Sequence, residues 1–195
     1  PSNATEWLMS VWGFAEDDVW AVGIKGTPAR SVLLHWDGSA WVNTTYATAT
    51  SLLDVWGTSA NDLWAGGMTS TLLHRASDTW TSVASGPDFS IYGLWGFGAN
   101  DVWAVGNGGS VSHFDGTSWS EVAGAGGTDW LWDAWGAAAN DVWVVGHADS
   151  ANTTKLYRWN GSTLAAVAAP AGVKGLWSVF GLAARGTIEK LAAAV

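Results

Sequence analysis

The chain has 195 residues, of which 48% are hydrophobic and only 13% are charged, which excludes an intrinsically disordered protein. Its formal net charge is −9, no Lys/Arg run is present, and no apolar run reaches the ~18 residues of a membrane span, so nucleic-acid binding and membrane insertion are both disfavoured. Cysteine is absent, which excludes disulfides and thiolate metal sites, while 25 Gly and 17 Trp favour β-structure with many tight turns.

One phrase recurs along the chain. It reads SVWGFAEDDVWAVG from Ser10, DVWGTSANDLWAGG from Asp54, GLWGFGANDVWAVG from Gly93, DAWGAAANDVWVVG from Asp133 and, in a weaker form, SVFGLAARGTIEKL from Ser178. The aromatic anchors of the phrase are separated by 44, 39, 40 and 45 residues, and they are Trp12, Trp56, Trp95, Trp135 and Phe180. A period of about 40 residues with several strand-like runs is typical of β-propeller blades.

Each repeat contains four strand-like runs, here described for the first repeat. Strand A ends in VWG, strand B is DVWAVG, strand C is VLLHW and strand D starts at AWV. Asp-Gly separates strands C and D, and this pair favours a tight hairpin because both central residues of a type I′ turn need positive φ. The short connections leave no room for crossover helices, so we expect antiparallel strands.

The sequence therefore predicts an all-β fold, a β-propeller of four-stranded antiparallel blades forming a single domain over residues 1–195. The repeats lie at about 7–50, 51–90, 91–129 and 130–172, with a partial fifth at 173–195, while residues 1–6 and 185–195 resemble vector-encoded sequence. An open ring exposes a sheet edge and an apolar face. Three arrangements remain open: a four-bladed ring that leaves the fifth start outside, a five-bladed ring, or a ring completed by a homo-oligomer.

Two loops between strands B and C are longer than the others. The first and fourth repeats carry five extra residues there, within IKGTPAR (24–30) and HADSANTTK (147–155). Equivalent loops share one rim of a propeller, and loops that vary on a constant scaffold are frequent binding sites. His147 begins the second of these loops and receives no role from the sequence.

Acidic residues occur in two repeated settings. Asp18, Asp62, Asp101 and Asp141 each precede a Val-Trp or Leu-Trp pair once per repeat, which favours a structural role in a turn. The position two before the anchor is instead variable, and strand alternation predicts that it faces the central channel. It carries Asp54 and Asp133, which form the only plausible carboxylate pair for acid–base or metal chemistry.

Three histidines are equivalent by repeat: His35, His74 and His113, with Arg158 at the fourth position. Three histidines suggest zinc, but equivalent residues on different blades should lie too far apart for metal–nitrogen bonds of ~2 Å. We expect each of them to hydrogen-bond a neighbouring loop or to contact a ligand. No metal, no cofactor and no catalytic residue is predicted, since a phosphate-binding loop and a nucleophile elbow are both missing from the sequence.

Aromatic residues flank the Asp-Gly turns. Trp36, Phe114 and Trp159 precede the turn, with Arg75 in the second repeat, and Trp41, Trp80 and Trp119 begin strand D. A sugar ring stacks its C–H face on an indole and directs its hydroxyls to nearby polar groups. The pattern of aromatic residues beside His or Arg is therefore a candidate carbohydrate site.

The phrase LLHWDGSAW, following WGFAEDDVWAVG, resembles the blades of Trp-rich lectin propellers of the tectonin-like and Photorhabdus types over residues 7 to about 172. The resemblance implies binding of glycans, often fucosylated or methylated, at shallow sites between blades. It also implies a bacterial secreted or cell-surface protein. Carried over by position, the ligand-binding residues would be His35, Trp36, Trp41, His74, Trp80, His113, Phe114, Trp119, Arg158 and Trp159.

Three functions follow from these observations. The leading hypothesis is a non-catalytic carbohydrate-binding propeller, which binds weakly at each site and gains avidity from repetition. The alternative is a protein-interaction or cell-surface repeat module. The third is a metal-assisted hydrolase, with a site at the channel or at a subunit contact built around Asp54 and Asp133. The fold alone does not choose among them.

Overall fold

A computed structural model describes residues 6–26, 30–44, 48, 50–148, 153–182 and 187–193, and side chains up to residue 181. Residues 27–29 and 149–152 of the two longer loops at 24–30 and 147–155 lie outside the described residues. So do residues 1–5, 185–186 and 194–195 of the segments that resemble vector-encoded sequence. Within the described part, no helix is long and apolar enough to cross a membrane. The one helical element there is the 3-10 turn η1 (Asn107–Gly109).

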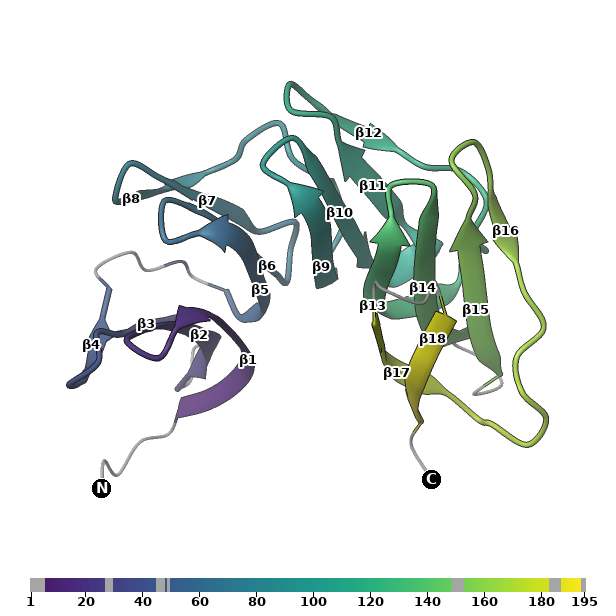
Figure 1. Ribbon diagram of the computed structural model, residues 1–195, viewed down its shortest axis with the longest axis horizontal. Coiled ribbons are helices and arrows are strands. Elements are labelled where there is room, and N and C mark those ends of the chain that lie inside the picture. Colours follow the sequence, from purple (N-terminus) through teal and green to yellow (C-terminus); the bar gives the residue numbers. More distant parts are fainter. Residues whose placement is uncertain are drawn as a thin grey trace. The chain divides into compact units, whose positions relative to one another are not determined.

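The described strands form four four-stranded sheets and one two-stranded sheet, shown in Figure 1. The first sheet contains β1 (Glu6–Ala15), β2 (Asp18–Lys25), β3 (Arg30–Trp36) and β4 (Trp41–Asn43). The second contains β5 (Leu52–Ser59), β6 (Asp62–Gly67), β7 (Leu72–Ala76) and β8 (Thr79–Ser82). The third contains β9 (Ile91–Gly98), β10 (Asp101–Gly106), β11 (Val111–Phe114) and β12 (Trp119–Glu121). The fourth contains β13 (Asp129–Ala138), β14 (Asp141–Ala148), β15 (Thr154–Trp159) and β16 (Leu164–Ala166), and the fifth sheet pairs β17 (Leu176–Leu182) with β18 (Thr187–Ala193).

Every sheet is an antiparallel meander in chain order, which confirms the prediction of an all-β fold with four-stranded antiparallel blades and a partial fifth. The anchor aromatic of strand A pairs with the Trp of strand B, as in Trp12 opposite Trp20 and Trp135 opposite Trp143. A bulge follows the first few residues of β1, β5 and β13, at the same place in each repeat. Such bulges bend the strand and increase its twist.

The chain forms two compact units, residues 1–91 and 92–195. In the first unit, buried side chains of the first sheet (Trp20, Val22 and Leu33) pack against those of the second (Leu52, Val55, Leu63, Ala65, Leu73 and Trp80). In the second unit, the third and fourth sheets share a core built around Trp103, Val142 and Tyr157. Another cluster joins Trp135 and Leu156 of the fourth sheet to Leu176 and Val179 of the fifth.

In three repeats the turns between strands C and D are not the type I′ hairpins that the sequence predicted, because only the Gly of each Asp-Gly or Asn-Gly pair has positive φ. Gly38, Gly116 and Gly161 have φ of 88°, 91° and 94°, values that L side chains rarely adopt. The preceding Asp37 accepts hydrogen bonds at Oδ1 from the backbone N–H groups of Ser39 and Ala40, both at 2.8 Å. These bonds hold the turn closed, so the hairpins are rigid supports for the residues beside them.

Candidate functional site

Each of the three equivalent histidines is bonded to an aspartate at the start of strand B in its own sheet. The Nε2 atoms of His35 and His74 lie 2.8 Å from Oδ1 of Asp18 and Asp62, and the equivalent distance from His113 to Asp101 is 2.7 Å. Trp20 Nε1 donates to Asp18 Oδ1 at 2.9 Å. The ring centroids of Trp20 and His35 are 4.2 Å apart, in a stacked arrangement. Each of the three histidines therefore links strand C to strand B of its own sheet.

Arg158 takes the place of the histidine in the fourth sheet. Its Nε donates to Asp141 Oδ1 at 2.7 Å, and its guanidinium carbon lies 5.2 Å from the centroid of the Trp143 ring. In the fourth sheet a guanidinium cation thus takes the place of the imidazole, next to the equivalent carboxylate and over the equivalent indole. The four members of this predicted set are bonded within their own sheets, and His35 also lines a pocket.

The residues before the C–D turn tie that turn to the turn between strands A and B. Trp36 Nε1 donates to the carbonyl oxygen of Glu16 at 3.0 Å, and Trp159 Nε1 donates to that of Ala139 at 3.2 Å. In the second repeat Arg75 donates through its guanidinium to the equivalent carbonyl, that of Ala60. Indole and guanidinium groups therefore fill the same structural position.

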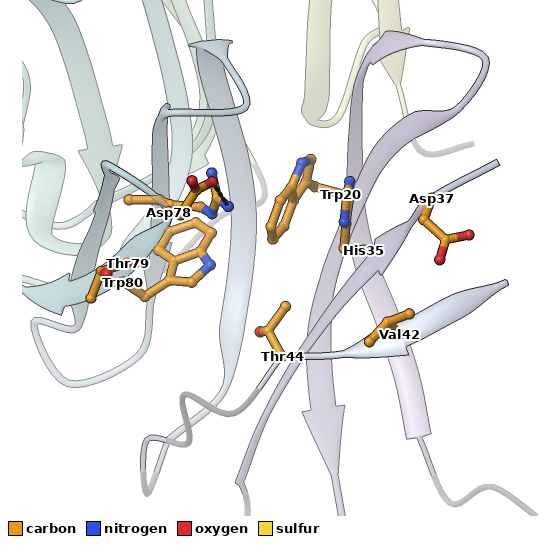
Figure 2. Close-up of a pocket in the computed structure, with 9 residues that line it drawn as sticks. Trp20, His35, Asp37, Val42, Thr44, Asp78, Thr79 and Trp80 are labelled. Atoms are coloured by element: carbon orange, nitrogen blue, oxygen red, sulfur yellow. Dashed lines mark hydrogen bonds and ion pairs between the residues drawn. The ribbon is translucent and has the colours of Figure 1, made fainter. Parts of the chain in front are cut away.

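A pocket of about 430 Å³ lies in the first unit, between the first and second sheets (Figure 2). Trp20, His35 and Thr44 enter it from the first sheet, and Asp78, Thr79 and Trp80 from the second, with Asp37, Val42 and Arg75 completing the wall. Of the residues predicted to bind ligand, His35 and Trp80 thus line one pocket. Asp37, Thr44, Asp78 and Thr79 were not predicted.

Arg75 organises one side of this pocket. It is buried, its Nη2 donates to Asp78 Oδ1 at 2.8 Å, and its Nη1 donates to Asn61 Oδ1 at 3.0 Å. Its guanidinium carbon lies 4.7 Å from the centroid of the Trp20 ring, to which His35 also stacks. The Trp20 ring is therefore already in contact with the Arg75 guanidinium and the His35 ring. Besides Val42 and Trp80, the pocket offers mainly polar contacts.

The second repeat departs from the others at the residues of this wall. Where the other repeats have Asp-Gly or Asn-Gly in the C–D turn, it has Ser77 and Asp78, with φ of 48° and 65°. A residue with a side chain in this left-handed region costs about 1–2 kcal/mol. The turn between strands B and C of the same repeat has a similar conformation, with φ of 53° at Thr69 and 56° at Ser70. The strained C–D turn carries the exposed carboxylate of Asp78 at the pocket.

The pocket holds anionic groups at neutral pH. The Ser39 hydroxyl and the backbone N–H groups of Ala40 and Ser39 lower the pKa of Asp37 to about 2. Asp78 pairs with Arg75, so these two charges offset one another. Trp80 is buried, and its indole N–H has no hydrogen-bond partner among the residues that the structure describes.

A second pocket, of about 530 Å³, lies in the second unit between the third and fourth sheets. It is lined by Glu121, Val122, Ala123, Gly124, Trp159, Ser162, Thr163 and Leu164. These positions are equivalent to those of the first pocket: Val122 corresponds to Thr44, Thr163 to Thr79 and Leu164 to Trp80. The location recurs between neighbouring sheets, but only the first pocket has a buried Arg and a Trp on strand D.

The remaining predicted residues lie apart from these pockets. Phe114 and Trp119 form a ring pair on their own hairpin, with centroids 5.5 Å apart, and Trp36 and Trp41 form one at 5.8 Å. His147, which had no assigned role, lies beside Trp177 with ring centroids 5.4 Å apart.

The carboxylates Asp54 and Asp133 are each bonded to a serine of a neighbouring strand A. Ser10 Oγ donates to Asp54 at 2.6 Å, and Ser178 Oγ donates to Asp133 at 2.8 Å. They belong to different units and each satisfies its own strand contact. No group of three or more His, Asp or Glu side chains that could hold a metal is found among the described residues. The hydrolase hypothesis gains no support from this geometry.

Comparison with known proteins gives the fold. No protein-family model matches the sequence, and no curated protein does. Among solved structures, YCF48 from Cyanidioschyzon merolae superposes with a TM-score of 0.65 at 12% identity, covering 93% of this chain and 62% of that one. The WD40 β-propeller domain of Doa1 superposes with a TM-score of 0.67 at 15% identity, covering 90% and 57%.

The extracellular domain of the putative hybrid two-component system BT3049 from B. thetaiotaomicron is a third neighbour, with a TM-score of 0.64 at 10% identity over 89% of this chain and 26% of that one. The chain thus spans less than two thirds of the length of these proteins. At such identities the likeness concerns the fold alone. The protein is a β-propeller repeat protein, and each four-stranded sheet is a blade.

Proposed function

We propose that the protein is a non-catalytic binding module, and that its ligand is a saccharide held in the pocket between the first two blades. One observation carries the proposal: the second repeat departs from the repeat pattern at Arg75, Ser77 and Asp78, and two of these three residues line that pocket. A repeat that served packing alone would gain stability from glycine in the strained turn.

The chemistry of the wall suits a sugar. Thr44 and Thr79 offer hydroxyls that donate and accept, Asp37 and Asp78 offer carboxylate oxygens, and Trp80 contributes an aromatic edge to the wall. Sugar hydroxyls need this mixture of directional acceptors and donors beside an aromatic ring. The carboxylates disfavour acidic sugars, so we expect neutral saccharides, including the fucosylated or methylated ones that the lectin resemblance implies.

The test begins with a glycan array on the labelled protein, followed by titration calorimetry with the best ligand. The two pockets supply a matched pair of variants, Thr79→Val and Thr163→Val, which remove equivalent hydroxyls from the first and second pocket. We expect Thr79→Val to weaken binding by about tenfold, which is ~1.4 kcal/mol, and Thr163→Val to leave it unchanged. Trp80→Leu, which copies Leu164 of the fourth blade, should abolish binding.

Two results would reject the proposal. One is the absence of any saccharide bound above background on the array. The other is binding that Thr79→Val and Trp80→Leu leave intact, which would move the ligand away from this pocket. Far-UV circular dichroism of each variant controls for unfolding, since Trp80 also packs against Trp20 with ring centroids 5.8 Å apart.

A further inference from the structure

Two titratable side chains of the fourth blade contact β17, the first strand of the fifth repeat, which packs beside β13 (Figure 1). Asp133 lies on β13 and accepts hydrogen bonds from Ser178 Oγ at 2.8 Å and from the Val179 N–H at 2.9 Å. His147 lies on β14, and its ring centroid is 5.4 Å from that of Trp177. Both groups therefore meet β17 within three consecutive residues, and all of these residues belong to the second unit.

The carboxyl group of Asp133 is buried where β9 and β17 pack against it. A Cβ atom on Gly93 of β9 would lie 2.9 Å from the Asp133 Cα atom, so the two backbones approach closely. Burial raises the pKa of Asp133 from 3.8 to about 6, although hydrogen bonds from Val179, Ser178 and Ala134 favour the charged form. The sequences of β9 and β17 contain no charged residue that could offset the carboxylate. Ionised Asp133 therefore opposes the close packing of β17 more than protonated Asp133 does.

His147 contributes through its aromatic neighbours. The ring centroids of Trp132 and Trp177 lie 5.8 and 5.4 Å from that of His147, and Trp130 is stacked with it at 6.4 Å. His147 Nδ1 lies 3.1 Å from the carbonyl oxygen of Ala148. Imidazole groups gain a proton as the pH falls from about 8 to 5, and a cation within about 6 Å of an indole ring is attracted to it. A protonated His147 therefore favours the position of Trp177 beside it.

The other charged residues of the neighbouring strands form two ion pairs, Asp129 with Lys155 at 3.3 Å and Asp141 with Arg158 at 2.7 Å. Asp129 is opposite Ala148, so the first pair lies near His147, where its two charges offset one another. Asp141 is opposite Ala138, at the other end of β13. Lys174 precedes β17 and is exposed, and β18 carries Glu189 and Lys190, whose side chains lie outside the described residues. Asp133 and His147 are thus the titratable groups in direct contact with β17.

We propose that β17 is held on the fourth blade by a proton-dependent junction, which is tight at about pH 5 and opens more often at about pH 8. The tight form has a neutral carboxyl group at Asp133 and a charged imidazole at His147. In both groups the added proton favours contact with β17, so the two effects have the same sign. Leu176 and Val179 pack with Trp135 at either pH, so the change is in the frequency of a local opening.

The size of the effect follows from the two groups. If opening returns the pKa of Asp133 from about 6 to 3.8, the opening constant rises about tenfold between pH 5 and pH 8. Loss of the attraction between a charged His147 and Trp177 adds a factor of about three. We therefore expect the two groups together to raise the opening constant about thirtyfold over this range.

The test is hydrogen exchange of the 195-residue chain, followed by mass spectrometry of peptides that cover β17, at pH 5.0, 6.5 and 8.0. After correction for the intrinsic pH dependence of amide exchange, the protection of residues 176–182 should fall about thirtyfold from pH 5.0 to pH 8.0. Asp133→Asn should remove most of this fall, His147→Gln should remove the smaller part, and the double variant should remove nearly all of it.

Asp115→Asn is the matched control. Asp115 is an exposed carboxylate of the same unit, and backbone hydrogen bonds from Ser118 and Thr117 lower its pKa, so it stays ionised over the whole range. Asparagine fits this turn position, because Asn160 occupies it in the fourth repeat and accepts equivalent bonds. This variant should keep the full pH dependence of β17.

Three results would overturn the proposal. One is a corrected protection of β17 that is equal at pH 5.0 and pH 8.0, and another is a fall that persists in the folded double variant. The third is a parallel fall in the amides of β10 in the same unit, which would mean that the whole unit loosens rather than the junction. Circular dichroism verifies folding, and if a variant does not fold, the comparison of β17 with β10 in the wild type decides. The saccharide pocket lies in the first unit, so the two proposals fail independently.

Discussion

Asp133 makes the stability of the second unit depend on pH in a way that can be worked out from its surroundings. Its Oδ2 accepts hydrogen bonds from Ser178 Oγ at 2.8 Å and from the backbone N–H of Val179 at 2.9 Å, and its Oδ1 accepts one from the N–H of Ala134 at 2.8 Å. Those bonds favour the charged form, but burial outweighs them and raises the pKa of Asp133 from 3.8 to about 6.

The sign follows from comparing the folded and unfolded chains. Below pH 3.8 the carboxyl group of Asp133 is protonated in both states. Between pH 3.8 and about 6 it is protonated in the folded state and ionised in the unfolded state, so the free energy of unfolding falls as the pH rises. A shift of about 2 pKa units corresponds to roughly 3 kcal/mol. That is an upper limit, because the side chain keeps some contact with solvent.

The perturbation is Asp133→Asn, measured by urea unfolding followed by circular dichroism at pH 4.0 and pH 7.5. The amide cannot accept bonds on both sides, so one backbone N–H loses its partner at a cost of about 1 kcal/mol at either pH. The variant should therefore be about 1 kcal/mol less stable than the wild type at pH 4.0. At pH 7.5 it should be up to about 2 kcal/mol more stable, because it carries no buried charge.

A direct titration checks the reasoning. A carbon-13 NMR titration of Asp133 that gave a pKa at or below 4 would refute the argument. So would parallel pH dependences of the wild type and Asp133→Asn.

Three further predictions concern the first unit. Leu63→Ala, at a fully buried position of the shared core, should lower the free energy of unfolding by about 3–4 kcal/mol in urea denaturation. Ser77→Gly relieves a positive φ and should raise it by about 1 kcal/mol, and an equal or lower melting temperature would contradict the strain argument. Arg75→Trp restores the residue that the first and fourth repeats use, so it should change the melting temperature little while weakening saccharide binding, measured by calorimetry.

The sequence predicted the blades because their signals are local. The anchor aromatics at intervals of about 40 residues and the Asp-Gly turns need no tertiary information, and Gly38 adopts the positive φ expected of it. The partner of the histidines was harder to predict. His35 bonds Asp18 on strand B rather than a neighbouring loop, because antiparallel pairing places Trp20 opposite His35 and brings the aspartate alongside. That contact depends on strand register, which the repeat alone does not state.

The pocket of the first unit was not predicted because its walls come from two blades. Thr44 and Thr79 belong to different repeats, and neither stands out in a pattern read along one strand. One signal was available: the second repeat has Arg75, Ala76 and Ser77 in place of the aromatic-Asp-Gly phrase, followed by Asp78. A departure from an otherwise regular repeat costs stability, and its position indicates where packing was not the main constraint.

Either an indole or a guanidinium group before the C–D turn can make the hydrogen bond that joins two hairpins. The residue at that position can therefore change the surface between blades without loss of this bond. Trp36, Arg75 and Trp159 all donate to the carbonyl of the A–B turn, so the hairpins stay joined whichever residue is present. The same side chain forms part of the wall between blades in the second repeat. A single codon can therefore alter the charge and shape of one inter-blade surface while its neighbours stay as they are. Such a scaffold can acquire a different ligand at each blade junction by successive single substitutions.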